Sequence, residues 1–140
     1  MIVENLAWTL PVLLGALLTS VITRKHKERE RFNDAAAEFR AAFIEEQRLL
    51  DHNSFADRAS AGSASSIIKN AIHNHERAMI KFEPFICHSR IEDYKKAWHD
   101  YAGDNNGFPQ YTGDTAIKKE KGRKLALDRI NNLLEFAKHK

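Results

Sequence analysis

Histidine and carboxylate side chains gather in one short polar segment, residues 72–77, which contains His73, His75 and Glu76. Metal sites on helices use ligands three or four residues apart, because such residues share one face of the helix. His73 and Glu76 meet this condition, and His99, further along the chain, offers a third ligand. His75 lies about 200° from His73 around a helix and fits a hydrogen-bonded position on the apolar face. We favour this second interpretation, in which Glu76 faces solvent, and we assign no metal ligand.

Sequence motifs of common reactions are missing from the chain. It contains no GxxxxGK[ST] phosphate loop, no GxGxxG segment after a strand and no GxSxG nucleophile turn. The adjacent pair His75 and Glu76 lacks the second histidine of a zinc-protease motif. We therefore predict no enzyme activity, no catalytic residue and no cofactor.

The element that leads into the helices is an uncharged run, Leu6 to Ile22, which is followed at once by Arg24, Lys25, His26, Lys27, Arg29 and Arg31. A helix of about 17 to 20 apolar residues is just long enough to cross a bilayer core. A cleaved signal peptide would begin with basic residues, whereas the first five residues contain Glu4 and no Lys or Arg. A buried core helix would need a larger apolar surround than this chain offers. We therefore predict a transmembrane helix.

The basic cluster after the run predicts the orientation of the protein. Lys and Arg near a membrane span resist translocation, so the N-terminus is expected outside and everything after Thr23 in the cytoplasm. This gives three parts: a transmembrane anchor over residues 1–23, a basic juxtamembrane segment over residues 24–31, and a helical cytoplasmic domain over residues 32–140. The expected location is a bacterial inner membrane, crossed once. Anionic lipid headgroups are the expected neighbours of the segment from Arg24 to Arg31.

The cytoplasmic part shows helical periodicity, and no stretch alternates as a strand would. A helix is expected from Arg24 to Leu50, directly continuing the span, and a connection follows from Asp51 to Ser66. Further helices are expected over residues 67–86, with Pro84 disturbing the last turn, over residues 89–103 behind a Ser89–Glu92 capping box, and over residues 120–137. The fold class is thus all-α: one transmembrane helix continuing into a small helical bundle.

Aromatic residues at helical spacing are expected to form the core, with Phe108 and Tyr111 of the loop at residues 103–114 folding back onto it. The core candidates are Phe32, Phe39, Phe43, Phe82, Phe85 and Trp98. Cys87, the single cysteine, is expected to be a small buried residue. The last helix is basic, and we interpret its cations as a solvated or lipid-facing surface in preference to a nucleic-acid interface: Lys118, Lys119, Lys121, Arg123, Lys124 and Arg129.

Four segments resemble an uncharacterised group of small bacterial proteins. They are FNDAAAEFRAAF at residues 32–43, HERAMIKFEPFI at 75–86, YKKAWHDY at 94–101 and LALDRINNLLEFAK at 125–138. The resemblance implies one N-terminal transmembrane helix followed by a helical cytoplasmic domain. It implies no particular activity.

These observations favour a membrane-anchored helical interaction or scaffold module at the inner face of the membrane. Its partners would be membrane lipid and a protein that the sequence does not identify, and a homo-oligomer is left open. One alternative is a phage or mobile-element membrane protein of the holin or spanin kind. Spanins normally place their helical part outside the cytoplasm, which the basic cluster argues against. The other alternative is a metal-dependent enzyme.

Overall fold

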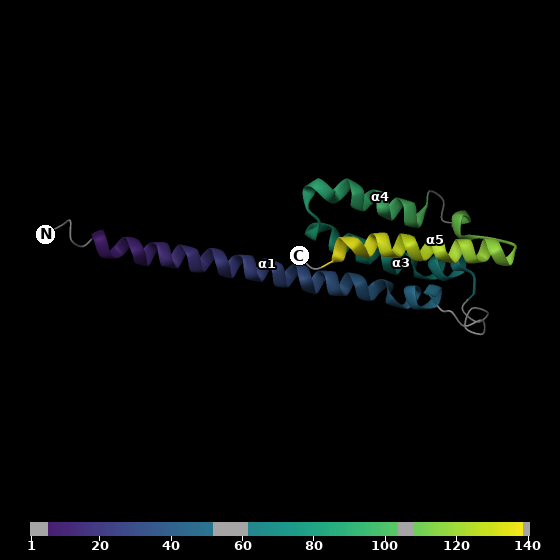
Figure 1. Cartoon of the computed structure of the whole chain (residues 1–140), viewed down its shortest axis with the longest axis horizontal. Helices are drawn as coiled ribbons and strands as arrows, with labels where there is room; N and C mark the ends of the chain where they lie inside the picture. Colours follow the sequence, from purple (N-terminus) through teal and green to yellow (C-terminus); the bar gives the residue numbers. More distant parts are fainter. Residues whose placement is uncertain (1–5, 52–61, 104–107, 139–140) are drawn as a thin grey trace. The chain divides into compact units, whose positions relative to one another are not determined.

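The computed structural model describes residues 6–51, 62–103 and 108–138, without the side chains of residues 6–17 and 109 (Figure 1). Over these residues the chain is all-helical and contains no strand, which confirms the predicted fold class at this level. The α-helices are α1 (Leu6–Asp51), α3 (Ala64–Phe82), α4 (Ile91–Ala102) and α5 (Ala116–Leu134). Short 3-10 turns cover η1 (Glu83–Phe85), η2 (His88–Arg90), η3 (Pro109–Tyr111) and η4 (Glu135–Ala137).

The chain divides into two compact units, residues 1–34 with residue 140, and residues 35–139. Helix α1 contributes to both units, so the helix expected after Arg24 does continue directly from the apolar run. In the part of the chain that the structure describes, no helix is both long enough and apolar enough to cross a membrane. Much of the expected anchor lies outside that part, namely residues 1–5 and the side chains of residues 6–17.

The second unit is an up-and-down bundle of α3, α4, α5 and the later part of α1. Helices α1 and α3 are antiparallel, because a later residue of α1 contacts an earlier residue of α3. The ring of Phe39 stacks on that of Phe82 with 4.7 Å between their centroids, and the ring of Phe43 stacks on that of His75 at 4.1 Å. Helices α4 and α5 are likewise antiparallel, since Tyr94 meets Phe136 and the Arg129 guanidinium reaches the carbonyl of Asp100. The short connection between α3 and α4, made by η1 and η2, favours this arrangement, because it joins neighbouring antiparallel helices.

The core of the bundle is rich in aromatic rings, as the periodicity predicts. Of the candidates in this unit, Phe39, Phe43 and Phe82 are buried, while Phe85 and Trp98 are half-buried. Phe32, which belongs to the first unit, is also buried. Phe108 and Tyr111 are buried as expected. The largest buried side chains also include Tyr94 and Tyr101 of α4. Tyr94 Oη donates to the Met79 carbonyl at 3.0 Å and Tyr111 Oη to the Tyr101 carbonyl at 2.7 Å, so these phenols are satisfied inside the core.

Helix boundaries differ from the prediction where local capping decides them. Helix α3 begins before Ile67 because Ser63 caps it, its Oγ accepting from the Ser66 amide at 3.2 Å. Helix α5 begins before Glu120 because Thr115 caps it, with its Oγ1 accepting a hydrogen bond from the Lys118 amide at 3.3 Å. The expected capping box at Ser89 is wrong: Ser89 lies inside the η2 turn, and its Oγ lies 3.3 Å from Cys87 Sγ.

The predicted burial of Cys87 and the predicted exposure of Arg123 are both wrong. Cys87 is exposed, because it lies in the short connection between η1 and η2 and not on a packed helix face. Arg123 is buried and does not belong to the basic surface, and its Nη2 donates to the Leu49 carbonyl near the end of α1 at 2.6 Å. That bond satisfies one of the carbonyls that a helix end leaves without an intrahelical donor. The neighbouring Lys121 and Lys124 are exposed, as expected.

Candidate functional site

A polar cluster lies in the bundle core, made by Glu46 of α1, His75 of α3 and Tyr101 of α4. His75 has no exposed surface, its Nδ1 lies 2.7 Å from Tyr101 Oη, and its Nε2 lies 3.1 Å from Glu46 Oε2. The ring of Phe43 stacks on the imidazole. The prediction that His75 is a hydrogen-bonded residue on the apolar face is confirmed.

One arrangement of donors and acceptors gives each of the three side chains a partner. His75 donates through Nε2–H to the Glu46 carboxylate, and Nδ1 accepts from the Tyr101 hydroxyl. Burial, together with the nearby Tyr111 and Glu46, raises the pKa of Tyr101, which keeps its proton on the oxygen. Burial alone would raise the pKa of Glu46, but the hydrogen bond from His75 and a backbone hydrogen bond lower it further than burial raises it. The pKa of Glu46 is therefore lowered and the group is a carboxylate.

The Glu46 carboxylate orients the ring of His75 as the carboxylate of a catalytic histidine–carboxylate pair does. Both ring nitrogens of His75, however, already have partners inside the core. A general base must reach the proton that it removes, and a ring with no exposed surface does not reach a bound substrate. Of the three side chains, Glu46 is the one that meets solvent, where it lines a surface hollow with Asn70, Asn74 and Arg77 of α3. The hydrogen bonds of the cluster connect α3 to both α1 and α4.

The lowered pKa of Glu46 predicts a pH dependence of stability. A group whose pKa is lower in the folded state stabilises that state above the unfolded pKa, and the contribution is lost as the pH falls through the folded pKa. We expect the wild type to unfold at a higher urea concentration than Glu46→Gln near neutral pH, and this difference to shrink as the pH falls below the ordinary pKa range of a carboxyl group. Denaturation by urea at several pH values measures it. The matched control is Glu45→Gln, because Glu45 is an exposed neighbour that pairs with Arg48. The difference in urea stability between the wild type and this control should change little with pH.

The alternative metal site is not assembled. His73 and Glu76 form an exposed pair with Nδ1 and Oε2 3.9 Å apart. Over the described ranges, no group of three or more His, Cys, Asp or Glu side chains could hold a metal ion, so His99 does not complete the set. The exposed position of Glu76 agrees with the interpretation that we favour.

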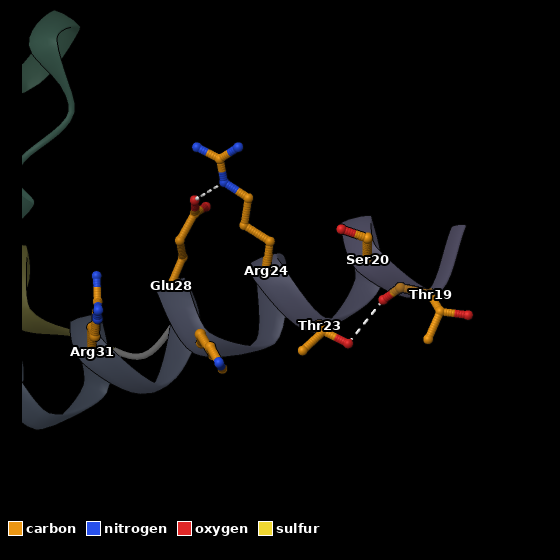
Figure 2. A pocket seen from close by; sticks show the side chains of 7 residues that line it. Thr19, Ser20, Thr23, Arg24, Glu28 and Arg31 are labelled. Atoms are coloured by element: carbon orange, nitrogen blue, oxygen red, sulfur yellow. Dashed lines mark hydrogen bonds and ion pairs between the residues drawn. The ribbon is translucent and has the colours of Figure 1, made fainter. Parts of the chain in front are cut away.

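A second candidate site lies in the first unit, on one side of α1 (Figure 2). Its residues recur at helical spacings and we call them the basic face: Ser20, Thr23, Arg24, Lys27 and Arg31. Thr19 and Glu28 flank the basic face and complete the lining of a shallow hollow. All five side chains are exposed. The basic face begins within the uncharged run and ends in the basic cluster, so it occupies the junction between the two.

Local bonds hold parts of the basic face in place. Arg24 Nε donates to Glu28 Oε1 at 3.3 Å, one helical turn further on, and both side chains are largely exposed. Such a surface pair adds little stability. The Thr23 hydroxyl donates back to the Thr19 carbonyl at 2.8 Å. The arrangement offers cations and hydroxyl groups on one side of a helix, which is suited to contact with phosphate oxygens.

Comparisons with protein-family models, with curated proteins and with solved structures found no match to this chain.

Proposed function

We propose that the protein is a membrane-anchored helical module at the inner face of a bacterial membrane, where its bundle binds or holds a protein partner. It crosses the membrane once, with the N-terminus outside, and it needs no catalytic residue or cofactor for this task. Leu6 to Ile22 forms the span and the segment from Arg24 to Arg31 contacts lipid headgroups.

One observation carries the proposal: an uncharged run and the basic cluster that follows it belong to a single helix, α1, which continues into the bundle. An apolar helix without charges is stable in lipid, where its backbone is satisfied internally. Lys and Arg directly after it favour a cytoplasmic position for the rest of the chain. The bundle has its own core, which supports an independent unit attached to an anchor.

The single cysteine tests the orientation, because Cys87 is exposed and belongs to the bundle. We expect a membrane-impermeant maleimide to label Cys87 in inverted membrane vesicles and not in intact spheroplasts. The reciprocal control is Cys87→Ser combined with Glu4→Cys, which moves the thiol to the other end of the span and should be labelled in spheroplasts. Labelling of Cys87 from outside would contradict the proposed orientation and favour the spanin-like alternative.

A further inference from the structure

The cations that follow the apolar run are not spread evenly around α1. Arg24, Lys27 and Arg31 lie within about 60° of one another, since each residue turns an α-helix by about 100°. Ser20 lies at a similar angle one turn earlier, and Thr23 lies close beside it. The basic face is therefore a strip of hydroxyl groups that leads into a strip of cations.

The opposite side of the same helix is different. Lys25 and Arg29 lie about 130 to 170° from the middle of the basic face. On their side, Leu18, Val21 and Ile22 expose 62, 51 and 62 % of their surface. Over these turns α1 has apolar side chains on one side and hydroxyl groups on the other. The basic face thus joins polar groups within the apolar run to the cations after it.

We infer that the basic face binds the phosphate groups of anionic phospholipids of the inner leaflet, an inference that rests on the proposed membrane anchor. Arginine offers a guanidinium fork to phosphate oxygens and lysine offers a point charge. The Ser20 hydroxyl lies deeper in the headgroup region and donates to lipid oxygens there. Leu18, Val21 and Ile22 on the other side contact acyl chains, so the helix presents one particular side to anionic headgroups.

The ion pair on the basic face is compatible with this role. Glu28 engages Arg24 through Nε, and the rest of the guanidinium points away from Glu28 (Figure 2). The Nη groups of Arg24 therefore remain directed outward for a phosphate group. Glu28 cancels one positive charge at the edge of the basic face, which leaves Lys27 and Arg31 as the cations that decide lipid preference.

The chain offers a matched pair of variants. Lys27→Gln with Arg31→Gln removes two charges, four residues apart, from the basic face. Lys25→Gln with Arg29→Gln removes two charges at the same spacing from the opposite side. The net charge of the two double variants is identical. Non-specific attraction between a basic segment and an anionic surface would weaken equally in both, whereas binding at the basic face would weaken in the first alone.

The experiment reconstitutes the full chain into phosphatidylcholine vesicles that contain trace spin-labelled phosphatidylglycerol or spin-labelled phosphatidylcholine. Electron paramagnetic resonance then gives the fraction of each lipid that the protein immobilises. We expect the wild type to prefer phosphatidylglycerol. The first double variant should lower this preference by at least about fivefold, because each cation near the surface changes binding about fivefold and the variant lacks two of them. The second double variant should keep the wild-type preference.

The other outcomes each overturn a different statement. Equal loss in both double variants, or no lipid preference in the wild type, would overturn the basic face as a lipid site while the anchor stands. Failure of the full chain to float with the vesicles would overturn the proposed anchor, and the inference with it. Displacement of phosphatidylglycerol by inorganic phosphate, but not by sodium chloride of equal ionic strength, would assign the basic face to a soluble anion instead.

Discussion

Replacing His75 with alanine is expected to lower the free energy of unfolding by about 2 to 4 kcal/mol. The change removes a ring with no exposed surface that stacks on Phe43. It also takes a partner from the partly buried Glu46 carboxylate and from the buried Tyr101 hydroxyl. Thermal and urea unfolding of the full chain in mild detergent, followed by near-ultraviolet circular dichroism, measures the loss of tertiary packing.

The matched control for this change is His73→Ala, two residues away on the same helix. His73 exposes 85 % of its side chain and pairs with Glu76 at the surface, so the expected change stays within about 0.5 kcal/mol. Equal destabilisation by both substitutions would contradict the role given to the cluster. A rise in melting temperature with zinc, lost in both His73→Ala and Glu76→Ala, would instead support the metal-site alternative.

Helical periodicity predicts much of the bundle because apolar stripes must be buried. The stripe through Phe39, Phe43 and Leu50 faces the core, as does the one through Ile68, His75, Met79 and Phe82. The precise ends of the helices depend on which serine or threonine reaches an amide. Ser63 and Thr115 reach one and Ser89 does not, a difference of local geometry that the sequence alone leaves undetermined.

The partner of His75 could have been found from the same periodicity. Glu46 stands three residues after Phe43 and four before Leu50, which places a carboxylate on an apolar stripe. A buried carboxylate needs a partner, and His75 is the polar residue on the facing stripe. The contact with Tyr101 could not be predicted in this way, because it depends on how far α3 and α4 are shifted along each other. The η1 and η2 turns make up the connection between these two helices.

The prediction for Arg123 is wrong because it relies on the charge of the residue and not on its spacing. It belongs to a run of lysines and its charge predicts a surface position, yet it is spaced with Ala126, Ile130 and Leu133 on the buried stripe of α5. Its position on that stripe predicts burial, and its charge only requires that an acceptor be present there. The Leu49 carbonyl provides one.

Removal of residues 1–23 is the second change with a large expected effect. The remaining chain retains the aromatic core and the Glu46–His75–Tyr101 cluster, which lies in the second unit. We expect it to be a soluble, helical protein that unfolds cooperatively without detergent. A fragment that is unfolded under gentle conditions would contradict the independence of the bundle.

Extraction of membranes with alkaline carbonate tests the proposed anchor most directly, because it strips proteins held only by surface contacts and leaves those that span the bilayer. We predict that the full chain stays in the membrane pellet and that the chain without residues 1–23 moves to the supernatant. Replacing Leu14 with Arg, in the middle of the run, should also release part of the protein, since a charge at the centre of a span costs about 2.5 to 3.5 kcal/mol. Full release of the unaltered chain by carbonate would contradict the anchor and the function built on it.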